Sequence, residues 1–303
     1  MSNFRKAERR KAKLRLAITG SAGSGKTYGA LLVAQGLGGR IAMIDTENGS
    51  GDLYSAICDY DILNIDAPFD PRKYIQAIHE AENECYEVLI IDSLSHCWIS
   101  EGGLLDMKEA LTASGKYNSF SAWSKVTPLQ NKLIEAMLTS KCHIIATMRS
   151  KTDYMQVVND KGRTEIRKVG LAPVQRDGMD YEFSIVFDLN GEHTVTVSKD
   201  RTSLFDGQSF KLSREIGSTL LEWLNSGKDI PDPRELNELK QSIYREYLSM
   251  FKGNKHEVQS RILEITEGRG SKDWSMSDIE ALQAEISKRQ ERQEVELDPA
   301  VNQ

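Results

Sequence analysis

The segment GSAGSGKT at residues 20–27 has the residue types and spacing of a phosphate-binding loop. It satisfies the pattern G-x-x-x-x-G-K-[ST], follows a short apolar run and opens a stretch with helical spacing. Its glycines allow successive backbone N–H groups to face one anion, and the helix N-terminus adds a favourable dipole. The residues expected to bind a nucleotide are Gly20, Ser21, Gly23, Ser24, Gly25, Lys26, Thr27 and Tyr28.

Two residues of this loop have more specific expected roles. Lys26 would reach the β- and γ-phosphates of ATP, and Thr27 would be a ligand of Mg²⁺. A second part of the same chemistry is expected at VLIIDS (88–93), four apolar residues that end in Asp92. That carboxylate would hold Mg²⁺ through water beside Thr27. ATP and Mg²⁺ are therefore the expected cofactors.

The stretch AMIDTENGS (42–50) brings Asp45 and Glu47 to the end of a second apolar run. In a parallel sheet the strand after the loop helix ends at the same edge, where ligands bind. Glu47 is the expected general base, which would orient and deprotonate the attacking water, with Asp45 as a supporting carboxylate. The alternative is that both acids are simply solvated in a loop.

Two further pairs could contact the nucleotide. Lys199 and Arg201, in VSKDRT (197–202), are two residues apart at the end of an expected strand and so point the same way. Inserted by a neighbouring subunit, such cations would neutralise transition-state charge and accelerate hydrolysis by roughly 10³–10⁵. Thr147 and Arg149 leave an apolar strand where they could sense the γ-phosphate. An exposed basic pair and an ordinary strand end remain the alternatives.

Three segments could contact nucleic acid, two of them rich in basic residues and one polar with aromatic residues. The segment 149–168 also has an aromatic residue for stacking; its candidates are Arg149, Lys151, Tyr154, Lys161, Arg163, Arg167 and Lys168. The polar stretch 112–125 contains Tyr117, Phe120 and Trp123, of which the last two are expected in the core. The first fifteen residues contain an F-x-x-A string at 4–7, a short pattern that chance explains. They also hold seven basic residues, which are Arg5, Lys6, Arg9, Arg10, Lys11, Lys13 and Arg15.

These residues must be positioned by strands that alternate with helices. Strands are expected at 14–20, 40–45, 61–66, 87–93 and 142–148, and helices at 26–37, at 71–85 and over most of 104–139, broken near ASGKYNS. This alternation predicts an α/β fold with a parallel sheet and right-handed crossovers.

After residue 150 the pattern changes. Two β-hairpins are expected, one over 154–169 and one over 181–200 with Asn-Gly as its turn. These antiparallel strands would extend the sheet, and a helix over 212–225 would close the domain. The expected organisation is a basic arm (1–13), an ATPase domain (14–225), a linker (226–233), a helical module (234–290, helices near 234–250, 254–267 and 276–289) and an acidic, disordered tail (291–303).

Composition limits the classes of function. The 303 residues are 39% hydrophobic and 28% charged, as in a soluble globular protein, and no apolar run approaches the ~18 residues of a membrane helix. A net charge of −6 confines any nucleic-acid binding to local patches. No cysteine pair has metal-like spacing, so reduced, buried thiols and a cytoplasmic location are expected: Cys58, Cys85, Cys97 and Cys142.

The chain resembles the phage-encoded RecA-like AAA-type ATPases related to the Sak single-strand annealing proteins. The resemblance covers about residues 14–210 and rests on GSAGSGKT, MIDTENGS, VLIIDSLSHCW, IIATMRSKTDY, GMDYEF and VSKDR in that order. It implies a RecA-like P-loop fold, with Glu47 after the second strand as base, because Ser93 stands where many AAA-type ATPases have their glutamate. It also implies a K-x-R pair supplied in trans by Lys199 and Arg201.

From this resemblance, the expected function is an ATPase that binds single-stranded DNA and promotes annealing or strand exchange. The expected partners are single-stranded DNA, further copies of the chain in a ring or filament, and a single-strand-binding protein, with no membrane. If phage-encoded, the protein would act in the host bacterial cytoplasm. Two alternatives stay open: a replication helicase or helicase loader, and a nucleotide switch that acts through protein partners.

Overall fold

The backbone is that of an α/β protein with one central sheet. The computed structural model describes residues 6–158, 164–228 and 233–297, with side chains omitted at 152–171, 233–235, 276 and 290–297. Within these residues, nine strands form one sheet in the order β3-β2-β4-β5-β1-β7-β8-β9, and β6 pairs with β5. The strands are β1 (Arg15–Gly20), β2 (Ile41–Asp45), β3 (Asp61–Asn64), β4 (Val88–Asp92), β5 (His143–Val158), β6 (Thr164–Pro173), β7 (Ile185–Leu189), β8 (Val195–Asp200) and β9 (Ser209–Phe210).

Strands β3, β2, β4, β5, β1 and β7 are parallel, and β8 and β9 extend the sheet in antiparallel fashion. The predicted fold class, a mostly parallel sheet extended by antiparallel strands, is therefore confirmed.

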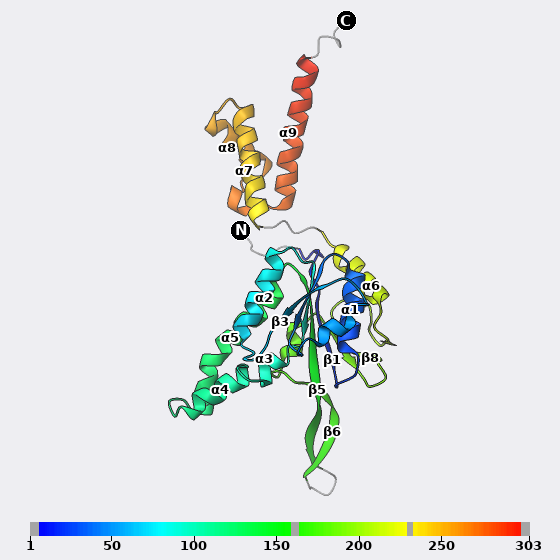
Figure 1. The fold of residues 1–303 in the computed structure, drawn as a ribbon. Coiled ribbons are helices and arrows are strands. Elements are labelled where there is room, and N and C mark those ends of the chain that lie inside the picture. The colour runs from blue at the N-terminus through cyan, green and yellow to red at the C-terminus, as the bar shows by residue number, and fades with distance from the viewer. Residues whose placement is uncertain (1–5, 159–163, 229–232, 298–303) are drawn as a thin grey trace. The chain divides into compact units, whose positions relative to one another are not determined.

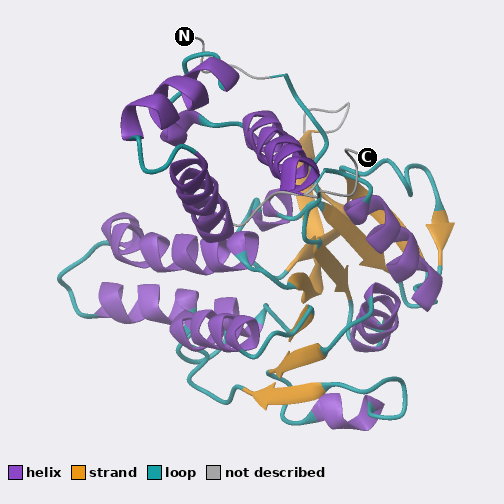
Figure 2. Ribbon diagram, turned by 90° about the horizontal axis from the view of Figure 1, so that it is seen from above, coloured by secondary structure: helices purple, strands orange, loops and turns teal. Residues whose placement is uncertain are grey.

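Helices cover both faces of the sheet (Figures 1 and 2). Helices α1 and α6 pack together on one face, and α2 and α5 pack together on the opposite face. The helices of this unit are α1 (Lys26–Leu37), α2 (Pro71–Asn83), α3 (His96–Ile99), α4 (Leu104–Ala113), α5 (Ser119–Thr139) and α6 (Arg214–Asn225), with 3-10 turns at Ser50–Tyr54 and Met179–Glu182.

Alternation along β1 divides the core between the two faces. Leu16 and Ile18 belong to the cluster beneath α1 and α6, whereas Ala17 belongs to the cluster beneath α2 and α5. Successive strand residues point to opposite faces, so a strand covered on both sides must be apolar at nearly every position. This is why the continuous apolar runs were readable as buried parallel strands.

The register aligns the ends of the strands that carry polar residues. Asp45 of β2 lies opposite Asp92 of β4, and Gly20 of β1 lies opposite Arg149 of β5. The phosphate-loop glycine, both aspartates and the arginine therefore occupy the carboxyl edge of the parallel sheet, where α/β proteins bind ligands.

Strand β5 is longer than its sequence pattern indicates. A strand ending at 148 and a separate hairpin from 154 were expected, but β5 runs unbroken from His143 to Val158. Up to Arg149 it pairs with β1; from Ser150 onwards it pairs antiparallel with β6. Figure 1 shows β5 and β6 projecting from the sheet. Polar residues interrupt the apolar run because the strand leaves the core there while its backbone stays paired.

The β7–β8 connection also differs from the expected two-residue Asn-Gly turn. It occupies Asn190–Thr194, where Asn190 N–H donates to the Thr194 carbonyl and the Asn190 side chain accepts from the Thr194 N–H. The positive φ of 61° falls on His193, and Gly191 does not have one. The Asn190 side chain thus organises a five-residue loop instead of a tight turn.

The described part of the basic N-terminal segment lies against the end of α6. Lys11 N–H donates to the Lys228 carbonyl (2.8 Å), and the Arg9 guanidinium stacks 4.0 Å from the Trp223 ring centroid. Arg15 is buried, and its guanidinium donates to the carbonyl of Leu138 in the last turn of α5 and to those of Ser140 and Cys142 just after it. Burial lowers the pKa of Arg15 to about 10. Arg15 is therefore unavailable to bind phosphate, and Arg5 and the start of the F-x-x-A string lie outside the described residues.

Two expectations about buried side chains are wrong. Phe120 is 88% exposed, because in the first turn of α5 it lies on the side of the helix away from the buried Ala122 and Val126. Trp123, in contrast, stacks on Trp98 at 5.7 Å and packs against the core as expected. Of the four cysteines, Cys97 and Cys142 are buried, but Cys85 is exposed and Cys58 is half-buried. All four are free thiols.

Residues Asp229–Gln303 form a second compact unit. It contains α7 (Pro233–Met250), α8 (Lys255–Ile265) and α9 (Met276–Leu297), with a core that includes Tyr247, Ile262, Trp274 and Leu282. Helix α9 continues to Leu297, into the segment expected to be a disordered tail, because no helix-breaking residue occurs before Pro299. Among the described residues, no helix has both the length and the apolar character needed to cross a membrane.

Candidate active site

The phosphate-binding loop has a conformation that depends on glycine. Gly25 adopts φ 87° immediately before α1, in the left-handed region that other residues avoid. At Gly20, a Cβ atom would lie 2.8 Å from the Leu189 carbonyl oxygen and 2.4 Å from Ser24 Oγ. The loop therefore tolerates no side chain at Gly20 and favours none at Gly25.

Polar groups of the loop are oriented by the loop itself. Lys26 Nζ donates to the Ser21 carbonyl at 2.8 Å. Burial lowers the pKa of Lys26, while the neighbouring carboxylates of Asp92 and Glu47 oppose that shift. Ser24 Oγ is buried and finds no hydrogen-bond partner within the described part of the chain.

Asp92 is the centre of a buried hydrogen-bond network. Thr27 Oγ1 donates to Asp92 Oδ2 at 2.5 Å, and Thr147 Oγ1 donates to Asp92 Oδ1. Burial raises the pKa of the Asp92 carboxyl above its usual range, although both hydroxyls act to lower it. The structure thus brings together the two residues predicted to hold Mg²⁺, with Thr147 as the second partner of the carboxylate.

Glu47 and Arg149 form an ion pair in the same cavity. Arg149 donates to Glu47 Oε1 from Nη2 at 2.8 Å and from Nε at 3.2 Å, with the two side chains 43% and 29% exposed. Both residues line a cavity of about 360 Å³, which is also lined by Lys26, Thr27 and Asp92. The predicted base, the phosphate-binding lysine and the metal-binding pair therefore face one space.

Asp45 is turned toward the backbone. Its Oδ1 accepts from Glu47 N–H at 2.6 Å and its Oδ2 accepts from Gly51 N–H at 2.8 Å. Buried at the end of β2, it fixes the loop that carries Glu47. Its support for Glu47 therefore acts through the backbone and not through a carboxylate facing the nucleotide.

Thr46 and His96 connect the two strand ends. Thr46 Oγ1 lies 2.7 Å from His96 Nδ1 and accepts from Ser93 N–H at 2.8 Å. Burial, followed by the charge of Arg149, lowers the pKa of His96. Sequence reasoning gave these residues no role, although His96 belongs to VLIIDSLSHCW, one of the motifs on which the resemblance rests. The sequence indicated only that two polar residues, Thr46 and His96, each follow a buried strand.

His193 is a second contact that sequence reasoning missed. Its Nδ1 lies 2.9 Å from the Ser24 carbonyl of the phosphate loop. Together with Tyr28, Gly25 and Tyr54 it lines a cavity of about 470 Å³ beside the loop. His193 belongs to the five-residue loop between β7 and β8, 169 residues after Ser24 in the chain, so no local sequence pattern could predict this contact.

Lys199 and Arg201 lie far from the phosphate loop of their own subunit. Because β8 is antiparallel, it begins at the carboxyl edge and ends at the opposite edge. Arg201 N–H donates to the Ser184 carbonyl, and Ser184 N–H donates to the Arg15 carbonyl. Arg201 is thus in line with the start of β1, five residues or about 16 Å along the strand from Gly20.

Lys199 has contacts within its own subunit. Its Nζ donates to the carbonyls of Tyr181 (2.5 Å) and Asp180 (3.2 Å), whereas the Arg201 side chain is exposed. Of the two residues predicted to act on a neighbouring subunit, Arg201 is the one whose side chain is exposed.

The DNA-binding candidates fall mainly on the β5–β6 extension. Lys151 is exposed, and in the antiparallel ladder Tyr154 lies opposite Lys168 and Met155 lies opposite Arg167. Arg149 is the exception, because its guanidinium contacts Glu47 in the cavity. Lys161 and Arg163 lie outside the described residues.

The residues present fit a Mg²⁺–nucleotide. The loop is shaped for a group that approaches the backbone, with unpartnered Ser24 Oγ beside it, and Thr27 and Asp92 supply the oxygen ligands that Mg²⁺ prefers. Mg²⁺ binds through one or two protein oxygens together with phosphates, so a dense cluster of acidic ligands is not required. The fold and this site define a P-loop ATPase.

A family profile for the AAA domain matches residues 12–219, about two thirds of the chain. The protein belongs to the AAA domain family, and it is an ATPase of the AAA/P-loop type. No curated protein matches the sequence.

Two solved structures show remote similarity. An ATPase of the type III secretion system of pathogenic bacteria is 14% identical, with 92% of this chain and 81% of that chain covered and a TM-score of 0.38. An ATP synthase subunit of Nanoarcheaum equitans is 12% identical, with 94% and 77% covered and a TM-score of 0.38.

Proposed function

We propose that this ATPase binds single-stranded DNA and uses Mg²⁺-dependent ATP hydrolysis to promote strand annealing or exchange in phage recombination or repair, in the host cytoplasm. The observation that carries the proposal is the position of Arg149. It contacts the predicted base Glu47, and it is also the last residue of β5 paired with β1 before the strand enters the β5–β6 extension. One residue thus links the ATP site to the segment expected to bind DNA.

In the hydrolytic step, Glu47 is the general base. Its carboxylate lines the cavity with Lys26 and Thr27, and Asp45 holds its backbone in place. Mg²⁺, when bound, neutralises phosphate charge, while Asp92 and Thr27 hold it. Arg149 keeps Glu47 ion-paired in the absence of nucleotide. A γ-phosphate competes for Arg149 and so frees the carboxylate to accept a proton from water.

The same competition supports coupling to DNA. When the Arg149 side chain turns from Glu47 toward a phosphate, the position of the β5 backbone at Arg149 changes, and this shift is passed to the β5–β6 extension that follows it. The basic residues of that extension would contact DNA phosphates, and Tyr154 would stack on a base. A single-strand-binding protein is the proposed companion because it occupies the same substrate.

The position of Arg201 supports hydrolysis at an interface between copies. About 16 Å along the sheet from its own phosphate loop, Arg201 cannot contact the nucleotide of its own subunit. We therefore assign it to the site of a neighbouring copy in a ring or filament.

The test is ATP turnover against protein concentration, with and without single-stranded DNA, for wild type, Glu47→Gln and Arg201→Ala. Turnover per subunit is expected to rise with concentration and with DNA, and both variants should lose about 10²-fold or more. Mixing the two variants should restore turnover, because each supplies the group that the other lacks. Absence of restoration would place Arg201 outside the site.

A second measurement separates the proposed function from other uses of the same ATP chemistry. Annealing of complementary oligonucleotides is expected, and it should be lost when residues 152–171 are replaced by a short glycine-serine loop. Directional unwinding of a forked duplex would indicate a helicase instead. ATP turnover unaffected by any DNA would indicate a switch that acts on protein partners.

A further inference from the structure

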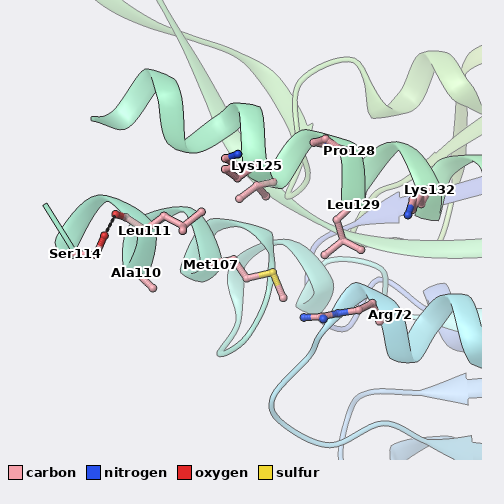
Figure 3. Close-up of a pocket in the computed structure, with 10 residues that line it drawn as sticks. Arg72, Met107, Ala110, Leu111, Ser114, Lys125, Pro128, Leu129 and Lys132 are labelled. Carbon is pink, nitrogen blue, oxygen red and sulfur yellow. Dashed lines mark hydrogen bonds between the residues drawn. The ribbon is translucent and has the colours of Figure 1, made fainter. Parts of the chain in front are cut away.

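A groove on the α4–α5 side of the sheet is separate from the ATP site. It encloses about 680 Å³ between α4 and α5, and the start of α2 borders it. Figure 3 shows Met107, Leu111 and Leu129, from α4 and α5, around the same space as Arg72 of α2. These helices pack on the sheet face opposite α1, so the groove does not share the walls of the nucleotide cavity.

The floor of the groove is aliphatic and only partly covered. Met107, Leu111 and Leu129 are each half-buried, and all three pack against the core cluster of this face. Pro128 also lines the groove within α5. The site therefore offers an aliphatic surface that a partner could cover.

The charged residues that line this groove all have one sign. Three of the ten residues that line the groove are cationic and none is acidic. Lys125 and Lys132 are both exposed and are seven residues apart on α5, or about 10 Å along one side of the helix, with Leu129 between them. Arg72 is partly neutralised by Asp70, at 2.8 Å. Lys125 Nζ lies 5.9 Å from the Tyr117 ring centroid. Among the described residues, neither lysine has an ion-pair partner within 4 Å, so both charges can pair with an anionic ligand.

We propose that this groove docks a short acidic segment of a partner protein, one that carries aliphatic side chains among its carboxylates. The aliphatic residues would cover Met107 and Leu129, and the carboxylates would pair with Lys125 and Lys132. A protein segment fits better than nucleic acid, because none of the ten residues that line the groove is aromatic and bases stack on aromatic rings. The volume is within the range of sites that bind small ligands or a few side chains, which limits the docked part to a short segment.

The experiment is a selection from a displayed random peptide library on the immobilised full chain, followed by anisotropy with the enriched peptide. Enriched sequences are expected to combine Asp or Glu with Leu, Ile or Val. The double variant Lys125→Glu, Lys132→Glu should bind the enriched peptide about tenfold or more weakly than wild type. The affinity of wild type for this peptide should decrease as the salt concentration rises. The control is Lys255→Glu with Lys272→Glu, two exposed residues of the C-terminal unit, which changes the net charge equally and should leave affinity unchanged. ATP turnover should be the same in all three proteins.

Several outcomes would overturn the proposal. These are the absence of enriched peptides, enrichment of peptides without acidic residues, and equal affinity for wild type and the groove variant. Binding of a labelled oligonucleotide that only the groove variant loses would assign the groove to nucleic acid. A change in oligomer mass, by light scattering, that occurs only in the groove variant would assign it to contact between copies. Since turnover is measured separately, these outcomes are independent of the proposed DNA function.

Discussion

Asp92 is a carboxylate that the fold buries for function at a cost in stability. Burial raises its pKa, so the ionised form is disfavoured in the folded protein. The free energy of unfolding contributed by this group therefore decreases as the pH rises above the ordinary carboxyl pKa of about 4. Thr27 and Thr147 reduce that cost because their hydroxyls donate to both carboxylate oxygens.

Replacing Asp92 by Asn should separate stability from activity. Without nucleotide at pH 7, the variant is expected to melt about 2–4 °C higher than wild type, or ~1 kcal/mol, because the buried charge is gone. The difference should shrink toward pH 4, where wild-type Asp92 also becomes neutral. ATP turnover should fall about 10²-fold or more, since Mg²⁺ loses its anionic partner. A variant less stable than wild type at pH 7 would contradict this account.

His143 makes the fold sensitive to acid. It is buried at the start of β5, its Nδ1 accepts from Leu14 N–H at 3.0 Å, and burial lowers its pKa to about 3. The unfolded chain protonates this histidine near pH 6.5 and the folded protein does not. The stability that its neutral form provides is therefore complete above pH 6.5 and is lost progressively as the pH falls below it.

Between pH 7 and pH 5 this loss should reach about 2 kcal/mol. In His143→Asn, the amide oxygen can accept from Leu14 N–H but does not titrate. We expect the variant to be less stable at pH 7, because a buried ring is lost, and to show a smaller loss on acidification. Urea unfolding at the two pH values measures both quantities. An equal pH dependence in the two proteins would exclude His143 as the origin.

At the scale of elements, contact between α1 and α6 depends on the absence of two side chains. A Cβ on Gly217 would lie 2.2 Å from the Val33 carbonyl, and one on Gly36 would lie 2.0 Å from the Arg214 carbonyl. The two glycines therefore allow the helix backbones to touch. Since α1 begins at Lys26, the packing of α6 fixes the helix whose N-terminus faces the phosphates.

Gly217→Ala should therefore destabilise the protein by about 1–3 kcal/mol through overpacking. Nucleotide affinity should also fall, because α1 must shift to admit the methyl group. The control is Gly191→Ala, where an added Cβ would have no neighbour within 4 Å and stability should change little. Thermal unfolding with and without Mg²⁺–ADP measures both effects. Equal melting temperatures for the two variants would show that the helices can move apart without loss.

At the scale of the whole molecule, the chain consists of two units with separate cores. Contacts divide it at Lys228 into Met1–Lys228 and Asp229–Gln303. The two clusters on the sheet faces contain no residue beyond Leu224, and the third cluster contains none before Leu236. Each unit therefore has the hydrophobic burial needed to fold independently.

A chain ending at Lys228 should thus retain cooperative unfolding and the full rise in melting temperature on adding Mg²⁺–ADP. Tyr247→Ala in the full chain, which empties the centre of the C-terminal core, should unfold that module alone. Calorimetry of the three proteins tests both statements. If truncation lowers the melting temperature of the ATPase unit by more than a few degrees, the two units are coupled.

The sequence by itself determined the features that depend on local chemistry and period. The glycine spacing of residues 20–27 requires a phosphate loop, and buried parallel strands covered on both faces read as continuous apolar runs. Because parallel strands end at the same edge of a sheet, the ends of β2 and β4 could be predicted to lie together, with Asp45, Glu47 and Asp92.

Tertiary structure decided the features that depend on which distant segments meet. Only the three-dimensional structure shows that Arg149 contacts Glu47, that the Asp45 carboxylate accepts from backbone N–H groups and that His193 contacts the phosphate loop. The exposure of Phe120 likewise depends on which side of α5 faces the core, and the length of β5 depends on its pairing with β6. A side chain's type limits the contacts it can make, but its partner is set by strand order and register, which the chain as a whole determines.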